Sequence, residues 1–146
     1  MTRVLFVCLG NICRSPTAEG VMAHLADARH VSLEIDSAGT GAWHASDPPD
    51  ARMTAAAAAR GIDLSHQKAR QVRVEDFHAF THIFAMDRQN LMDLRAIMPA
   101  DASADLALFL REGAEVPDPY YGGADGFEHV LDLVEKRAGE LLDQLC

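Results

Sequence analysis

Residues 4–22, VLFVCLGNICRSPTAEGVM, have the pattern of a buried strand, a tight loop and a helix in immediate succession. The first five residues are all apolar, which is typical of a strand covered on both faces of a parallel sheet. Gly10 and Asn11 follow, and these two residue types tolerate a positive φ angle best. Pro16 suits the first turn of a helix, and Ser15 is placed to cap it. This unit favours an α/β fold.

The loop inside this unit predicts an oxyanion site that contains a nucleophile. Backbone N–H groups ahead of a helix, with the positive end of its dipole, converge on one point and attract an anion. Arg14 adds a forked cationic donor that suits two oxygens of a phosphate. Cys8 lies at the mouth of the same region, where a thiolate is stabilised. A Cys-x5-Arg spacing alone is weak evidence, because free cysteines often only pack at strand ends; the surrounding loop favours catalysis.

Strand and helix patterns alternate along the rest of the chain. Asp50 is placed to cap a helix that Gly61 ends, and Pro99 ends another helix. The predicted strands cover 4–8, 31–39, 81–87 and 104–110, and the predicted helices cover 16–29, 51–60, 74–79, 88–98 and 127–145. This alternation predicts a parallel sheet with helices on both faces. A length of 146 residues fits one domain spanning 1–146.

The composition narrows the classes of function. A formal net charge of −9 argues against nonspecific nucleic-acid binding, which needs a basic face. No segment has the unbroken apolar length of a membrane span, and no signal-peptide pattern is visible. Three cysteines, an odd number, argue against a secreted disulfide framework. The seven histidines are scattered without a metal-ligand spacing. We therefore expect a cytoplasmic protein that binds neither nucleic acid nor membranes.

Two motifs, VCLGNICRSP at 7–16 and DPYYGG at 118–123, make the chain resemble the low-molecular-weight protein tyrosine phosphatases. The similarity continues in the family's order through DSAGT, the Trp43 segment, KARQV and AMDRQNL. It implies a flavodoxin-like, three-layer α/β/α fold around a four-stranded parallel sheet. It also implies an enzyme that hydrolyses phosphotyrosine on proteins without a metal or cofactor, and we expect this enzyme to be a monomer. Phosphate and other oxyanions would be its ligands and inhibitors.

The resemblance implies a mechanistic role for each matching residue. Cys8 would form a cysteinyl-phosphate intermediate, and Arg14 would hold the phosphate oxygens. Asp118 would be the general acid and then the general base, in a loop that two prolines stiffen. Taken alone, its PDP triplet would suggest only a surface turn. The implied phosphate-binding loop consists of Leu9, Gly10, Asn11, Ile12, Cys13, Arg14 and Ser15.

Apolar and aromatic residues near the two motifs match family positions that line a slot for the substrate's ring. These residues are Leu9, Ile12, Trp43, Tyr120 and Tyr121. A deep slot favours phosphotyrosine, because the shorter phosphoserine does not reach its base. The other interpretation is that Trp43 and the tyrosine pair are half-buried loop anchors.

Two further expectations concern the support of the loop, which the resemblance implies, and its oxidation. Asn11, Ser37 and His66 match a network that holds the loop in shape, with Gln67 as the alternative to His66. Cys13 is close enough to Cys8 in the chain for a redox disulfide between them. The alternative for Cys13 is simple packing.

Three related functions fit the residues less well. Arsenate reductase needs further cysteines for a disulfide relay, and none lies between Cys13 and Cys146. Protein-arginine phosphatases of the same family tend to carry threonine at the position of Ile12 and a single aromatic where this chain has Tyr120 and Tyr121. A silent phosphoprotein-binding module would lack the nucleophile or the acid, and both are present.

Overall fold

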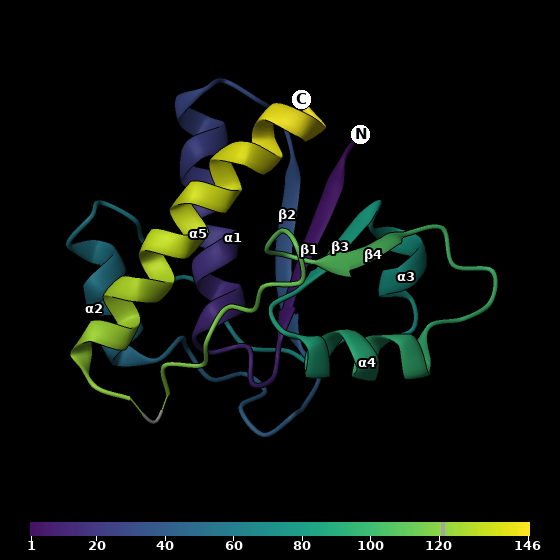
Figure 1. The fold of residues 1–146 in the computed structure, drawn as a ribbon, viewed down its shortest axis with the longest axis horizontal. Coiled ribbons are helices and arrows are strands. Elements are labelled where there is room, and N and C mark those ends of the chain that lie inside the picture. The colour runs from purple at the N-terminus through teal and green to yellow at the C-terminus, as the bar shows by residue number, and fades with distance from the viewer. Residues whose placement is uncertain (121) are drawn as a thin grey trace.

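The computed structural model describes residues 1–120 and 122–146 (Figure 1). Its sheet consists of the parallel strands β1 (Arg3–Cys8), β2 (Glu34–Gly39), β3 (His82–Ala85) and β4 (Asp105–Leu108), in the order β2-β1-β3-β4. The helices within this part of the chain are α1 (Arg14–Ala28), α2 (Ala51–Ala58), α3 (Asp76–Ala79), α4 (Arg88–Ile97) and α5 (Ala124–Leu145). The predicted alternation of strands and helices is confirmed.

Helices cover both faces of the sheet, as Figure 1 shows. On one face, α1, α2 and α5 pack over Val4 and Phe6 of β1. On the other face, α3 and α4 pack over Leu5 and Val7. Successive side chains of a strand point to opposite faces, so a strand buried on both sides must be apolar at every position. This explains the unbroken apolar run at the start of the chain.

The strand order places a ligand site at the carboxyl end of β1. The order 2-1-3-4 begins the flavodoxin-like order 2-1-3-4-5, in which the chain reverses direction across the sheet between β1 and β3. Ligands bind at this reversal, beyond the carboxyl ends of the strands. Cys8 is the last residue of β1. Both termini lie at the other end of the sheet (Figure 1).

The predicted start of the first helix is wrong. The helix begins at Arg14 rather than Pro16, because the carbonyl of Cys13 already accepts the N–H of Thr17. Ser15 is therefore inside the first turn and provides no side-chain cap. The predicted cap at Asp50 is present, since its side chain accepts the first backbone N–H groups of α2. The other boundaries differ from expectation by a few residues: β2 is shorter than 31–39, and α5 begins before 127.

Candidate active site

The loop from Leu9 to Cys13 turns back toward the sheet, and its shape depends on a few backbone positions. Asn11 has a φ of +57°, as its residue type allows, whereas Gly10 does not use a positive φ. A Cβ at Gly10 would lie 3.0 Å from the ring of His44. At the end of β2, a Cβ at Gly39 would lie 2.8 Å from the carbonyl oxygen of Leu9. Glycine at these two positions therefore lets the loop lie close to its neighbours.

Hydrogen bonds from buried side chains hold the loop in this shape. The Asn11 amide donates to Ser15 Oγ at 2.8 Å and to Ser37 Oγ at 3.0 Å. Its oxygen accepts the backbone N–H of Arg70 at 3.0 Å. Ser37 in turn donates to the carboxylate of Glu19 at 2.6 Å. The structure thus brings Asn11 and Ser37 together, and it adds Glu19 and Arg70, which the sequence did not single out.

Among the described residues, His66 makes no hydrogen bond to this network's loop residues, but it lies close enough to Glu19 for its charge to act on that carboxyl group. Within the part of the chain that the structure describes, no hydrogen bond joins exposed His66 to Asn11 or Ser37. Gln67 is buried instead and donates to the carbonyl of Pro16 at 3.0 Å. The polar end of the network is Glu19, whose pKa is raised by burial and lowered in part by the hydrogen bond from Ser37. No sequence pattern distinguishes Glu19 from an ordinary helix carboxylate.

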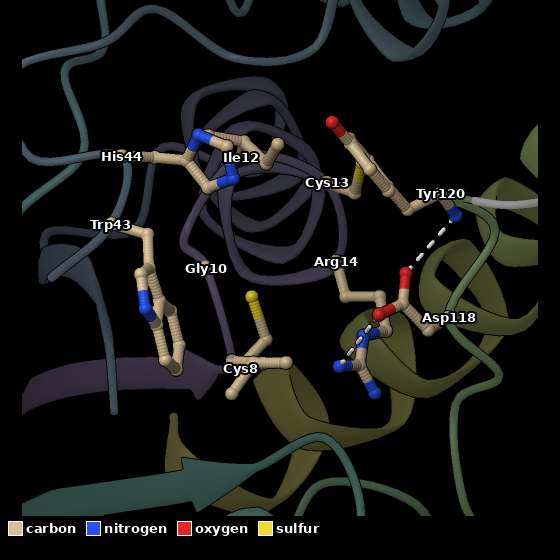
Figure 2. A pocket seen from close by; sticks show the side chains of 10 residues that line it. Cys8, Gly10, Ile12, Cys13, Arg14, Trp43, His44, Asp118 and Tyr120 are labelled. Carbon is tan, nitrogen blue, oxygen red and sulfur yellow. Dashed lines mark hydrogen bonds and ion pairs between the residues drawn. The ribbon is translucent and has the colours of Figure 1, made fainter. Parts of the chain in front are cut away.

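Cys8 and Ser15 form the centre of the site. The Cys8 sulfur is 3.0 Å from Ser15 Oγ, in a hydrogen bond between the two side chains. Cys8 is 3% exposed, and Figure 2 shows its sulfur pointing into the pocket between Trp43 and Arg14. Ser15 Oγ also accepts a hydrogen bond from the Asn11 amide and lies 3.4 Å from the Ala38 carbonyl, to which it can donate. The hydroxyl is therefore fixed where it can donate to a thiolate.

Arg14 is a buried cation with three oxygen partners. Its Nη1 donates to Asp87 Oδ2 at 2.6 Å and to the Val116 carbonyl at 3.1 Å. Its Nη2 lies 3.6 Å from Asp118 Oδ2. Burial opposes its charged form, but the charges of Cys8, Asp87 and Asp118 outweigh burial and raise its pKa. Asp87 was missed in the sequence, although its place directly after a buried strand was a usable signal.

Asp118 approaches the same cavity from the loop before α5. Its Oδ1 accepts the backbone N–H of Tyr120 at 3.0 Å, and its side chain is 39% exposed. The N–H of Val116 donates to the Met86 carbonyl at 2.8 Å and so fixes the loop to the end of β3. Figure 2 shows Asp118 and Trp43 on opposite sides of the Cys8 sulfur. A group bound at the sulfur therefore has a carboxyl group on one side and an indole ring on the other.

These side chains enclose a cavity of about 300 Å³. Its lining is Cys8, Leu9, Gly10, Ile12, Cys13, Arg14, Trp43, His44, Asp118 and Tyr120. Four of the five residues expected to form the substrate slot thus meet here, and Tyr121 lies outside the described residues. Trp43 is 73% exposed, with its ring packed against the backbone of Gly41, so it is not a half-buried anchor. His44 also lines the cavity and was missed.

Cys13 also lines this cavity, as a buried free thiol. Burial, with smaller contributions from the charges of Asp50 and Cys8, raises its pKa to about 12.

In residues 1–120 and 122–146, no three His, Cys, Asp or Glu side chains are grouped so that they could hold a metal ion. No helix in these residues combines the length and apolar character that crossing a membrane requires.

The fold and the site define the class: a phosphatase with a cysteine at the base of an oxyanion loop. The chain matches the family model for low molecular weight phosphotyrosine protein phosphatase over residues 3–146, and it belongs to that family. It is 43% identical over 150 residues to a low molecular weight protein-tyrosine-phosphatase of Streptomyces coelicolor, covering 96% of this chain and 91% of that protein. The predicted family membership is confirmed, and the protein is a low molecular weight protein-tyrosine-phosphatase.

Solved structures agree with this assignment. A protein tyrosine phosphatase from Entamoeba histolytica, with Hepes in its active site, has a TM-score of 0.93 and 37% identity, covering 99% of this chain and 97% of that one. A drosophila arginine phosphatase has a TM-score of 0.91 and 30% identity, covering 99% and 98%. The predicted fold class is confirmed.

Proposed function

We propose that this enzyme hydrolyses phosphotyrosine in proteins through a cysteinyl-phosphate intermediate and without a metal. Cys8 is the nucleophile, Arg14 and the loop N–H groups bind the phosphate oxygens, and Asp118 is the general acid and base. The observation that carries the proposal is the meeting of these three side chains in one cavity, with Arg14 Nη2 3.6 Å from Asp118. Phosphoryl transfer needs mainly positioning and charge stabilisation, and these groups supply both.

In the first step, the Cys8 thiolate attacks phosphorus in line with the tyrosyl oxygen. The S–P bond forms as the P–O bond breaks, and Asp118 gives its proton to the departing phenolate oxygen. Arg14, held in place by Asp87, and the loop N–H groups stabilise the charge on the three phosphoryl oxygens. The bound dianion offsets the charge of Arg14, whose Nη2 lies beside Asp118.

In the second step, a water molecule replaces the phenol. Asp118, now a carboxylate, takes a proton from the water as its oxygen attacks phosphorus. The S–P bond breaks, inorganic phosphate is released, and the Cys8 thiolate is restored. Ser15 supports the departure of the thiolate, because its hydroxyl lies 3.0 Å from the Cys8 sulfur.

The walls of the cavity support an aromatic phosphoester as the substrate. Ile12, Trp43 and Tyr120 surround the space above Cys8, and Cys8 itself is almost fully buried. A phenyl ring fills such a slot, whereas the shorter phosphoserine leaves its phosphate above the loop. Free phosphate and other oxyanions occupy the same loop and act as inhibitors, consistent with Hepes in the active site of the Entamoeba relative.

All the groups in this chemistry come from one chain: Cys8 ends β1, Arg14 begins α1 and Asp118 lies in the loop before α5. We therefore propose a single-domain enzyme that is active as a monomer, with tyrosine-phosphorylated proteins as its partners. The three cysteines are free, which fits a reducing compartment such as the cytoplasm.

Turnover of a phosphotyrosine peptide by wild-type protein and by Cys8→Ser tests the proposal. We expect Cys8→Ser to abolish turnover while its circular dichroism and thermal unfolding match those of wild type. A chelator should leave the wild-type rate unchanged. Hydrolysis that survives Cys8→Ser, or that the chelator stops, would contradict the proposal.

A further inference from the structure

A second hollow adjoins the phosphate cavity and shares two of its walls. The lining of this flanking hollow, of about 300 Å³, includes Leu9, Trp43, Val72, Asp93 and Ile97, together with the polar Gln71. Leu9 and Trp43 also line the phosphate cavity. Leu9, Trp43 and Ile97 are 41%, 73% and 44% exposed, so the hollow presents apolar side chains to solvent beside the substrate site. Exposed apolar groups gathered at one place are typical of binding surfaces.

Asp93 is the one charged residue among those that line the flanking hollow. It lies on α4 and accepts a hydrogen bond from the Gln89 amide at 2.9 Å. Among the ion pairs of the described residues, none neutralises Asp93. A hollow with apolar walls and a carboxylate that no ion pair neutralises suits a side chain that has a long apolar stem and a cationic end.

We propose that the flanking hollow is a subsite for a lysine or arginine side chain of the substrate, two residues away from the phosphotyrosine. This inference rests on the proposed hydrolysis of phosphotyrosine proteins. The methylene stem packs against Ile97 and Trp43, and the cation pairs with Asp93. The exposed indole face of Trp43 adds a cation–π contact. The subsite therefore selects a class of substrate sequence and takes no part in the chemistry.

The separation of two residues follows from the geometry of an extended peptide. Side chains alternate between the two faces of an extended chain, so positions i and i+2 share a face and lie about 6.5–7 Å apart. When the phosphotyrosine enters the cavity, the next side chain points away from the enzyme. The side chain after it faces the adjoining hollow. Because the two depressions share Leu9 and Trp43, one continuous peptide spans both of them.

Matched phosphotyrosine peptides test the subsite. Lysine, norleucine or glutamate is placed two residues before the phosphotyrosine in one set and two residues after it in the other. Norleucine keeps an apolar stem and lacks the charge. At one of the two positions we expect kcat/KM to be about threefold higher for lysine than for norleucine and roughly tenfold higher than for glutamate. The difference should be in KM, because the contact is remote from the phosphate, and it should shrink at high salt.

Two variants separate the charge of the subsite from its apolar wall. Asp93→Asn should remove the preference for lysine over norleucine, and Ile97→Ala should raise KM for both of these peptides. The matched control is Asp105→Asn, which removes one exposed carboxylate at the start of β4, at the opposite end of the sheet. This control should leave the ratio of lysine to norleucine peptides at its wild-type value.

Two further results would overturn different parts of the account. Equal kcat/KM for the three peptides at both positions, or a lysine preference that survives Asp93→Asn, would overturn the subsite while hydrolysis continues. If wild-type enzyme hydrolyses none of the phosphotyrosine peptides, the proposed function fails instead.

Discussion

Arg14 and Asp87, 73 positions apart in the chain, form a 2.6 Å hydrogen bond between a buried guanidinium and a carboxylate. The other oxygen of Asp87 accepts the N–H of Asn90 at 2.7 Å and so caps α4. One carboxylate therefore starts a helix on one side of the sheet and fixes the cation of the phosphate loop. The position of Arg14 depends on the junction between β3 and α4 as much as on its own loop.

Replacement of Asp87 separates these two tasks. Asp87→Asn keeps an oxygen for the helix cap and removes the charge that orients Arg14. A hydrogen bond to a charged group contributes about 1.5–3 kcal/mol, so we expect kcat/KM to fall roughly 10- to 150-fold. Inhibition by inorganic phosphate should weaken as well. Steady-state kinetics with a thermal unfolding control measures both effects, and unchanged phosphate inhibition would show that Arg14 does not need Asp87.

Asp118→Ala tests the assignment of the general acid. Loss of one acid–base group typically lowers the rate by about 10²–10⁴, and we expect this range for kcat on phosphotyrosine. For esters whose leaving group needs no proton, the rate of the first step should fall much less. Rates for a series of aryl phosphates with leaving groups of different pKa measure how the loss depends on the leaving group. Equal losses across that series would assign the acid role to another group.

The pKa of Cys13 sets the pH dependence of a disulfide with Cys8. Peroxide should oxidise Cys8 first, and the Cys13 thiolate should then attack it. Because the pKa of Cys13 is about 12, its thiolate fraction rises about tenfold per pH unit across pH 7–10. We expect disulfide formation to accelerate accordingly, as measured by mass spectrometry after peroxide pulses at several pH values. Cys8 found only as sulfinic or sulfonic acid, with Cys13 free, would reject the pairing.

Ile12 connects the shape of the pocket to the class of substrate. We expect kcat/KM for phosphotyrosine peptides to exceed that for phosphoserine and phosphoarginine peptides by at least roughly tenfold, because the aromatic walls favour a phenyl ring. Ile12→Thr should reduce the preference for phosphotyrosine over phosphoarginine, because it replaces an apolar wall with a hydroxyl. This comparison has particular value because one structural relative is an arginine phosphatase. A wild-type preference for phosphoarginine would overturn the substrate class and leave the Cys8 chemistry standing.

Features of the site that are local in sequence could be predicted, and those that depend on tertiary contacts could not. Cys8, Arg14 and the loop between them lie in one strand–loop–helix unit, so their spacing, taken together with that unit, indicated an anion site. Asp87 and Glu19 act through partners far away in the chain, and an isolated carboxylate carries no signal of such a partner.

One local interpretation was wrong because a buried side chain has partners that the sequence does not show. Ser15 looked like a helix cap, but its hydroxyl is directed to Cys8 and Asn11 inside the first turn. The sequence also left open whether His66 or Gln67 supports the loop. In the structure His66 is exposed and lies near Glu19, whereas Gln67 is buried and donates to the carbonyl of Pro16. These contacts join segments far apart in the chain, which the sequence pattern predicts only coarsely.

The covalent intermediate is the centre of the proposed mechanism, and acid quenching measures it most directly. An aryl phosphate with a good leaving group is mixed with wild-type enzyme and quenched in acid within the first turnover. The phosphorylated residue is then located by mass spectrometry. For wild-type enzyme we expect a burst of phenol, and we expect to find phosphate attached to Cys8. Neither should be seen for Cys8→Ser. Phosphate found on another residue would contradict the cysteinyl-phosphate mechanism. Hydrolysis with a burst of phenol but no phosphoenzyme would contradict it as well.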